Sequence, residues 1–282
     1  MARPYRSVLY IPAANARAME KAQGLAADAI IFDLEDAVAP GEKSAAREML
    51  LSALAHDYGH RAKIVRINAQ ATEWGPEDAR FCASLAGRAD AVLIPKVDDA
   101  DDLDTVAALV PDLPLWAMME TPLGMLNAAR IAAHSRLEGM VMGTNDLAKE
   151  LNSRFRPDRL PMQAGLGLCL LAAKAYGKVI VDGVFNAFKD EDGLRAECAQ
   201  GRDMGFDGKT LIHPLQLPVA NEAFAPTEAE IDLARRQIAA FDQAGAEGKG
   251  VAVVDGKIVE NLHVETARKT LDRAEAIAAM AG

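Results

Sequence analysis

The sequence predicts a closed, eight-stranded parallel βα (TIM) barrel with a C-terminal extension made of helices and a hairpin. Three observations support this fold class. Short apolar runs rich in β-branched residues recur along the chain, and helical patterns separate them. After the eighth run this alternation stops. The eight runs, taken as strands, are residues 7–12, 29–34, 63–68, 91–96, 115–120, 139–143, 179–184 and 209–214.

The segments between these runs are long enough to form crossover helices. Strands that alternate with helices indicate a parallel sheet, and eight such units fit a closed barrel, for which ~250 residues is typical. An open, doubly wound sheet is the alternative. No GxGxxG motif follows the first strand, so the dinucleotide-binding form of that fold is disfavoured. The clearest helical patterns cover residues 16–26, 43–55, 75–86, 100–110 and 124–134.

We predict two domains, a catalytic barrel over residues 1–225 and an extension over residues 226–282. The extension does not continue the βα pattern, so we expect it to act as a lid, as an oligomer arm, or as both. It is expected to contain, in order, a threonine-capped amphipathic helix (227–244), a glycine-rich hinge (245–250), a hairpin about the Asp255-Gly256 turn, and a last helix (262–280).

Composition argues against several classes of protein. A net charge of −10 over 282 residues argues against nonspecific binding to nucleic acid or to anionic membranes. No apolar run approaches the ~18 residues of a membrane span, and the first residues lack a signal-peptide pattern. Cys82, Cys169 and Cys198 are scattered without CxxC spacing, which indicates buried free thiols in a reducing compartment. We therefore expect a cytoplasmic protein.

Polar side chains gather where the predicted strands end. In a parallel barrel the carboxyl ends of the strands form the active site, so these side chains are expected at one rim. The acidic 33–36 stretch could instead cap the next helix, and Lys96 and Asp182 fit a structural role equally well. For His213 we favour a structural role. The residues concerned are Asp33, Glu35, Asp36, Arg66, Asn68, Lys96, Glu120, Asp146, Asp182 and His213.

Two of these carboxylates, Glu120 and Asp146, follow neighbouring strands. Two converging carboxylates repel each other unless a cation lies between them. Mg²⁺ prefers such a site, with one or two protein carboxylates and with water or substrate oxygens in the other positions; Mn²⁺ is the alternative metal. Arg66 could bind a carboxylate in a bidentate pair. A metal beside an arginine suits an α-keto acid, which the metal would polarise as a Lewis acid.

Eight motifs, in order along the chain, resemble the citrate lyase beta-subunit/malyl-CoA lyase family, the acyl-CoA lyases of the phosphoenolpyruvate/pyruvate superfamily. The resemblance covers residues 6–267, and its members are βα barrels. The motifs are RSVLYIPAAN, ADAIIFDLEDAVAPGEKSAAR, VRIN, LIPKV, METPLG, GTNDLAKEL, DGV and GFDGKTLIHPLQ.

The resemblance implies roles for individual residues. It implies that Glu120 and Asp146 bind Mg²⁺, that Arg66 binds the keto acid, and that Glu35 and Asp36 orient metal-bound waters. Substrate is then expected at Arg66, Glu120, Gly143 and Asp146. Coenzyme A is expected to contact Tyr10, Asn15, Lys21, Ile212 and Pro214.

Two positions depart from the family pattern. Asn15 stands in the loop where relatives carry an arginine for CoA phosphate. Glu260 stands where relatives often supply an aspartate, from a neighbouring subunit, as acid or base. An added methylene displaces the carboxyl group, and a misplacement of ~1 Å can cost ~10²-fold in rate. The neighbour-supplied group implies a homo-oligomer, a trimer or a hexamer.

The activity implied by the resemblance is a reversible carbon–carbon lyase that needs Mg²⁺. It would cleave a 3-hydroxyacyl-CoA of malyl-CoA, methylmalyl-CoA or citramalyl-CoA type to an acyl-CoA and glyoxylate or pyruvate. The catalytic residues implied are Arg66, Glu260, Glu35 and Asp36. A malyl-CoA thioesterase is an alternative, and so is a citrate lyase beta subunit acting on a carrier-protein-bound substrate. A non-catalytic CoA-ester binding protein and a metal-dependent aldolase of free keto acids are further alternatives.

Overall fold

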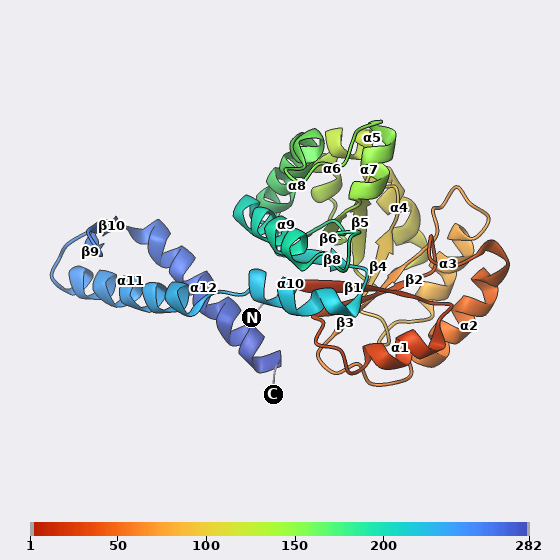
Figure 1. The fold of residues 1–282 in the computed structure, drawn as a ribbon, viewed down its shortest axis with the longest axis horizontal. Helices are drawn as coiled ribbons and strands as arrows, with labels where there is room; N and C mark the ends of the chain where they lie inside the picture. Colours follow the sequence, from red (N-terminus) through yellow and green to blue (C-terminus); the bar gives the residue numbers. More distant parts are fainter. Residues whose placement is uncertain (1–2, 281–282) are drawn as a thin grey trace. The chain divides into compact units, whose positions relative to one another are not determined.

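A computed structural model describes residues 3–280, which form two compact units. The larger unit, Tyr5–Ala223, is the barrel drawn from red to cyan in Figure 1. The smaller unit comprises residues 3–4 and 224–280. The predicted fold class, a TIM barrel with C-terminal helices and a hairpin, is confirmed. The role of the smaller unit as lid or oligomer arm stays a prediction.

Eight parallel strands pair in chain order, and β8 pairs with β1 to close the barrel. Several strands end a few residues before the predicted runs do, because the last residues of those runs leave the sheet and turn toward the next helix. Glu120 is one of them. The strands are β1 (Ser7–Pro12), β2 (Ala29–Asp33), β3 (Ala62–Arg66), β4 (Ala91–Ile94), β5 (Leu115–Met119), β6 (Leu137–Met142), β7 (Val179–Asp182) and β8 (Gly208–Leu211).

Alternate side chains of each strand face the barrel interior. Ile31, Ile64, Trp116 and Met118 belong to one buried cluster there, and other members come from β1, β4, β6 and β7. The same alternation carries the interior face past Met118 to Glu120. An acidic side chain thus lies directly above an apolar barrel core.

Helices cover the outside of the barrel (Figure 1). In residues 3–280 no helix is long and apolar enough to cross a membrane. The three cysteines are free and buried, as predicted. The helices of the barrel unit are α1 (Ala16–Ala22), α2 (Lys43–Ala53), α3 (Gly75–Ala83), α4 (Ala100–Leu109), α5 (Pro122–Leu126), α6 (Ala128–Ala132), α7 (Thr144–Glu150), α8 (Gln163–Ala175), α9 (Glu191–Met204) and α10 (Leu217–Ala223), with short 3₁₀ turns at Pro40–Glu42, Leu160–Met162 and Pro214–Gln216.

Gly139 in β6 allows the close packing of Trp116. A Cβ at this position would lie 2.5 Å from two atoms of the indole ring, which is 1% exposed and cannot move freely. We expect Gly139→Ala to lower the free energy of unfolding by about 3 kcal/mol, the upper range for overpacking, measured by chemical denaturation. Gly167→Ala in α8, where nothing lies within 4 Å of a new Cβ, is the control. It should leave stability unchanged or raise it by up to ~1 kcal/mol. Equal stability of the two variants would contradict the packing argument.

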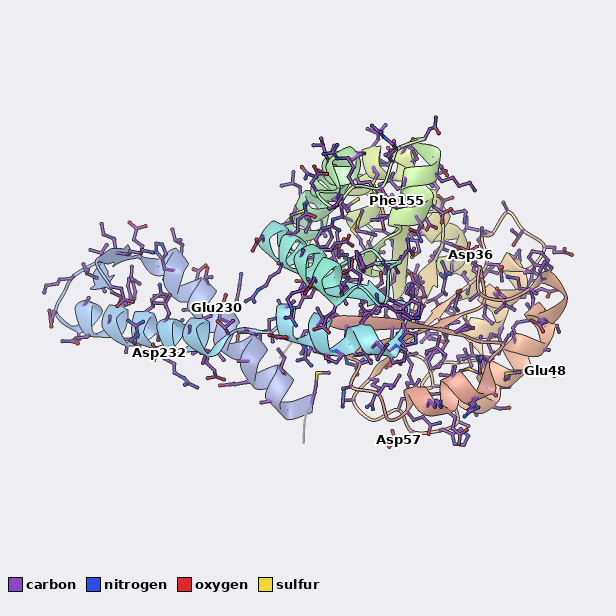
Figure 2. The ribbon with its side chains drawn as sticks, in the orientation of Figure 1. Asp36, Glu48, Asp57, Phe155, Glu230 and Asp232 are labelled. Atoms are coloured by element: carbon purple, nitrogen blue, oxygen red, sulfur yellow. The ribbon has the colours of Figure 1, made fainter. Side chains whose placement is uncertain are left out.

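The smaller unit contains two long helices joined by a hairpin. Helix α11 (Glu228–Ala246) begins with a capping box between Thr227 and Glu230, the latter labelled in Figure 2. It runs through Ala246, so the predicted hinge begins later than expected. Strands β9 (Ala252–Val254) and β10 (Lys257–Val259) pair antiparallel about Asp255 and Gly256, both with positive φ, as the Asp-Gly turn predicts. Helix α12 (Asn261–Met280) completes the unit.

Candidate active site

A cavity of about 390 Å³ opens at the carboxyl ends of the barrel strands. Its lining comes mainly from the ends of β1, β2, β3, β5, β6 and β8 and from the residues that follow them. This is the rim at which the sequence places the site. Of the predicted site residues, Tyr10, Asp36, Arg66, Glu120, Gly143, Asp146 and Ile212 line the cavity.

Asp33 holds one edge of the Arg66 guanidinium group, and Glu35 faces Nη1. Asp33 and Arg66 are in register at the ends of β2 and β3. Arg66 donates from Nε to Asp33 Oδ1 at 2.8 Å and from Nη2 to Asp33 Oδ2 at 2.6 Å. Burial alone would lower the pKa of Arg66, but the charge of Asp33 raises it well above its ordinary value. An arginine has five N–H groups, so these two bonds leave three on Nη1 and Nη2. Nη1 lies 2.9 Å from Glu35 Oε2 and 3.8 Å from Asp36 Oδ2, so a substrate carboxylate at this edge would share Arg66 with these two acidic side chains.

Asp33 also accepts hydrogen bonds from backbone N–H groups. Its carboxylate oxygens accept from the amides of Glu35 and Ala37, so it fixes the loop after β2 in addition to Arg66. The buried Lys43 Nζ donates to the Leu34 and Glu35 carbonyl oxygens and to Asn68 Oδ1. This lysine, missed as a site residue by the sequence reasoning, holds the acidic loop against the residues that follow β3.

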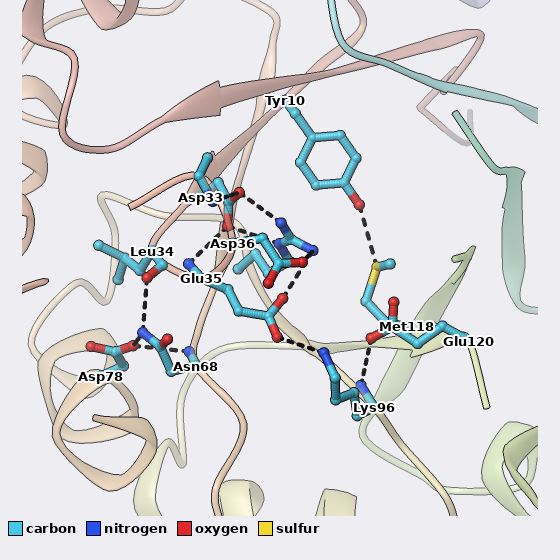
Figure 3. Close-up of polar contacts among 12 residues, drawn as sticks. Tyr10, Asp33, Leu34, Glu35, Asp36, Asn68, Asp78, Lys96, Met118 and Glu120 are labelled. Atoms are coloured by element: carbon cyan, nitrogen blue, oxygen red, sulfur yellow. Dashed lines mark hydrogen bonds and ion pairs between the residues drawn. The ribbon is translucent and has the colours of Figure 1, made fainter. Parts of the chain in front are cut away.

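Lys96 connects Glu35 to Glu120. Its Nζ donates to Glu35 Oε1 at 3.2 Å, and its backbone N–H donates to Glu120 Oε1 at 2.8 Å (Figure 3). Lys96 has φ +51°, a left-handed conformation uncommon for a residue with a side chain. Glu35 Oε2 lies 2.9 Å from Arg66 Nη1 but makes no hydrogen bond among the described residues. Lys96 therefore has a structural role beside both carboxylates.

Glu120 is 1% exposed, and its charge must be offset by something nearby. Burial, and after it the negative Glu35, raise the pKa of Glu120 to about 7, and the Lys96 amide and side chain offset this only in part. A divalent cation beside Glu120 would supply the missing positive charge. The environment of Glu120 therefore fits a magnesium ligand.

Asp146, in the first turn of α7, lines the same cavity. Gly143 lies between β6 and α7, where a Cβ would overlap Cβ and Oε2 of Glu120, so only glycine leaves room for that carboxylate. Within residues 3–280 no three His, Cys, Asp or Glu side chains converge as a possible metal site. Two carboxylates, with the other positions left to water and substrate, match Mg²⁺.

Two rim residues have structural roles. Asp182 is fully buried in a network of charges with Arg159 and Lys209. His213 stacks on Phe188 with ring centroids 4.6 Å apart, and its Nδ1 accepts from the Leu215 backbone N–H. These contacts support a structural role for His213 and favour the same role for Asp182.

Comparison with known protein families shows which family the chain belongs to. The profile described as HpcH/HpaI aldolase/citrate lyase matches residues 6–214, which is more than half of the sequence. The chain belongs to the HpcH/HpaI aldolase/citrate lyase family. A second profile, C–C bond lyase of the TIM-barrel fold, matches residues 167–278. The resemblance inferred from the motifs is thereby confirmed.

Relatives within the family carry two kinds of name. The chain is 72% identical over 279 residues to a protein of Cereibacter sphaeroides named (3S)-malyl-CoA thioesterase, covering 99% of this chain and 97% of the relative. It is 37% identical over 286 residues to the citrate lyase subunit beta of Escherichia coli, covering 97% and 94%. Among solved structures, CitE of Mycobacterium tuberculosis in complex with magnesium, acetoacetate and coenzyme A matches with a TM-score of 0.81 and 32% identity, covering 97% of this chain and 98% of that one.

The residues expected to bind CoA in this family member are not gathered at one place. Tyr10 and Ile212 line the cavity. Asn15 caps α1, where its Oδ1 accepts from the Ala18 backbone N–H, and Lys21 and Pro214 are exposed outside the cavity lining. Their CoA contacts stay predictions.

Glu260 belongs to the smaller unit and precedes α12. Its backbone N–H donates to His263 Nδ1, and its side chain is exposed. No hydrogen bond or ion pair of its carboxylate is found within residues 3–280, so the group is available for proton transfer.

Proposed function

We propose that this chain hydrolyses the thioester of a malyl-CoA-type 3-hydroxyacyl-CoA in a Mg²⁺-dependent reaction. One observation carries the proposal: the chain is 72% identical, over nearly its whole length, to proteins named (3S)-malyl-CoA thioesterase. Thioester hydrolysis therefore replaces the carbon–carbon lyase, which the motifs alone favoured, as the first candidate. The rim carboxylates and Arg66 support both reactions, since both begin with the same bound substrate.

The cavity offers groups for each part of the substrate. The N–H groups of Arg66 that Asp33 does not use can bind the carboxylate of the malyl group beside Glu35. Glu120 and Asp146 would hold Mg²⁺, which when bound supplies Lewis-acid polarisation of the substrate oxygens. The relative CitE was solved in complex with magnesium, acetoacetate and coenzyme A, which supports a magnesium ion and a CoA ester as ligands of this fold.

Hydrolysis also requires an oriented water and a proton carrier. Glu35 Oε2 is a buried acceptor without a hydrogen bond, and the exposed Asp36 lines the cavity nearby, so both can orient water. We propose Glu260, supplied by a neighbouring subunit of a homo-oligomer, as the proton carrier. The proton leaves the attacking water and ends on the departing CoA sulfur.

A carbon–carbon lyase is the second candidate. The 37% identity to the citrate lyase beta subunit favours it. In that reaction the same cavity would release an acyl-CoA and glyoxylate or pyruvate, or would act on a carrier-protein-bound ester.

A time course distinguishes the two candidates. The protein is incubated with Mg²⁺ and malyl-CoA or citramalyl-CoA, and free thiol and keto acid are followed separately, with EDTA as the control. Free thiol without keto acid is the expected result. Keto acid without free thiol would instead establish a lyase. Neither product in the presence of metal would point to a carrier-protein substrate or to a binding role.

Glu260→Ala tests the proton carrier. Loss of a positioned acid or base costs ~10²–10⁴-fold, so kcat should fall by at least about 10²-fold, while binding of glyoxylate and Mg²⁺ is kept. Steady-state kinetics and calorimetric binding measure the two effects. Glu265→Ala, at an exposed glutamate of α12 five residues further along the chain, is the control and should keep wild-type kcat. Unchanged catalysis in Glu260→Ala would remove this residue from the mechanism.

A further inference from the structure

The hydroxyl group of Tyr10 faces an acceptor that a substrate oxygen can replace. Tyr10 lies on β1, half-buried, and lines the cavity. Its Oη donates to Met118 Sδ at 3.3 Å (Figure 3). A thioether is a weak acceptor, so exchanging it for a carbonyl oxygen costs little and strengthens the hydrogen bond.

The phenol ring is held in a fixed position. The Arg66 guanidinium carbon lies 5.0 Å from the centre of the Tyr10 ring, and Arg66 is in turn held by two hydrogen bonds to Asp33. Three neighbouring strands, β1, β2 and β3, carry these residues. Burial raises the pKa of Tyr10, so the hydroxyl keeps its proton and remains a donor. Such a preorganised donor is what an oxyanion requires.

Substrate chemistry brings the thioester to the same cavity. In a malyl-type ester the thioester carbon is two bonds from the carbon that bears the hydroxyl group. An α-hydroxy acid bound between Arg66 and the Glu120–Asp146 pair therefore places its thioester carbonyl within a few ångströms of them, inside a cavity that Tyr10 also lines.

We infer that the Tyr10 hydroxyl is a catalytic donor that hydrogen-bonds to the thioester carbonyl oxygen as negative charge develops on it. This inference rests on the proposed hydrolysis. Water forms a bond to the carbonyl carbon, and the C=O π pair moves onto the oxygen that Tyr10 contacts. The tetrahedral intermediate then reforms the C=O bond, the C–S bond breaks, and the CoA sulfur takes the electron pair and a proton. Tyr10 keeps its own proton throughout.

The test compares Tyr10→Phe with a matched control. Removing one oxyanion donor costs ~10²–10³-fold in kcat, so Tyr10→Phe should lose about 10²-fold in kcat with little change in KM. Inhibition by a thioether analogue of malyl-CoA, which lacks the carbonyl group, should be unchanged, because the ground-state contacts remain. Tyr58→Phe is the control. Tyr58 is a buried tyrosine whose hydroxyl donates to the Met19 carbonyl oxygen outside the cavity, so this variant should keep wild-type kcat.

Three results would overturn the inference. Wild-type kcat in Tyr10→Phe would show that the hydroxyl is not needed. A rise in KM with unchanged kcat would make Tyr10 a binding contact only. Weaker inhibition by the thioether analogue, in step with the loss of kcat, would show that the substitution distorts the site. The wild-type product assay keeps the two proposals separate: absence of thiol release removes the proposed function, whereas thiol release retained in Tyr10→Phe removes only the role of Tyr10.

Discussion

Asp146→Asn is expected to lower Mg²⁺-dependent thioester hydrolysis by more than about 10²-fold and to leave the fold intact. The substitution keeps the size of the side chain but removes one of the two negative charges that would hold the metal. Replacing even an outer-sphere partner of a metal site lowers metal affinity or activity 10–100-fold, so replacing a direct ligand should lower them more. Asp146 is half-buried in the first turn of α7. Loss of its negative charge at the helix N-terminus should lower the free energy of unfolding by no more than ~1 kcal/mol.

The measurement is kcat/KM across a Mg²⁺ titration, together with a thermal unfolding curve. Asp101→Asn is the matched control, because Asp101 also lies in the first turn of a helix, α4. Its side chain is 88% exposed and does not line the cavity that contains Glu120 and Asp146. It should keep both activity and Tm. Wild-type turnover in Asp146→Asn, still abolished by EDTA, would place the metal elsewhere.

The rim of the barrel could be predicted from the sequence because two regular patterns converge there. The spacing of apolar runs locates the strand ends, and the alternation along β5 takes Trp116 and Met118 to Glu120 on one face. A glutamate that continues an interior face is buried whatever its role, so the burial of Glu120 could be predicted on physical grounds, while its role as a metal ligand stays a prediction. Asp33 was open between a helix cap and a site residue. Its carboxylate accepts from loop amides and from Arg66, and neither the 3₁₀ turn at Pro40–Glu42 nor α2 has a side-chain cap, so the cap was not formed.

Contacts between strands could not be predicted in the same way. The pairing of Asp33 with Arg66 depends on the register of β2 against β3, which a single sequence does not state. Lys43 was missed because a lysine at the start of a helix usually faces solvent, whereas here three acceptors bind its ammonium group in the interior. The sequence around Lys96 does not predict its left-handed backbone conformation either.

The charges beneath the rim form a second system that the sequence did not reveal. Asp182 accepts from Arg159 Nη1 at 2.7 Å and from Lys209 Nζ at 3.1 Å. Lys209 also donates to Glu197 at 2.6 Å and is fully buried. Two positive and two negative groups thus balance inside the barrel unit. Burial alone would raise the pKa of Asp182, but the charges of Lys209 and Arg159 outweigh it and lower the pKa.

Asp182→Asn is therefore expected to destabilise the barrel strongly. Removing one partner of a buried ion pair costs about 3–5 kcal/mol, because the remaining charges stay buried without compensation. Urea denaturation at neutral pH should show a loss in that range. The double variant Asp182→Asn/Lys209→Met restores the charge balance and should be more stable than Asp182→Asn alone, which a simple loss of packing does not predict.

The pH dependence gives a second readout of the same network. A carboxylate whose pKa is lower in the folded than in the unfolded chain stabilises the fold above its unfolded pKa, near 3.9. That contribution is lost as the pH falls through the lower folded value. Wild-type stability should thus fall more steeply below about pH 4 than the stability of Asp182→Asn, which has no such carboxylate to protonate. Parallel acid denaturation curves for the two proteins, or a double variant less stable than Asp182→Asn, would mean that the network does not stabilise the folded state through its charges.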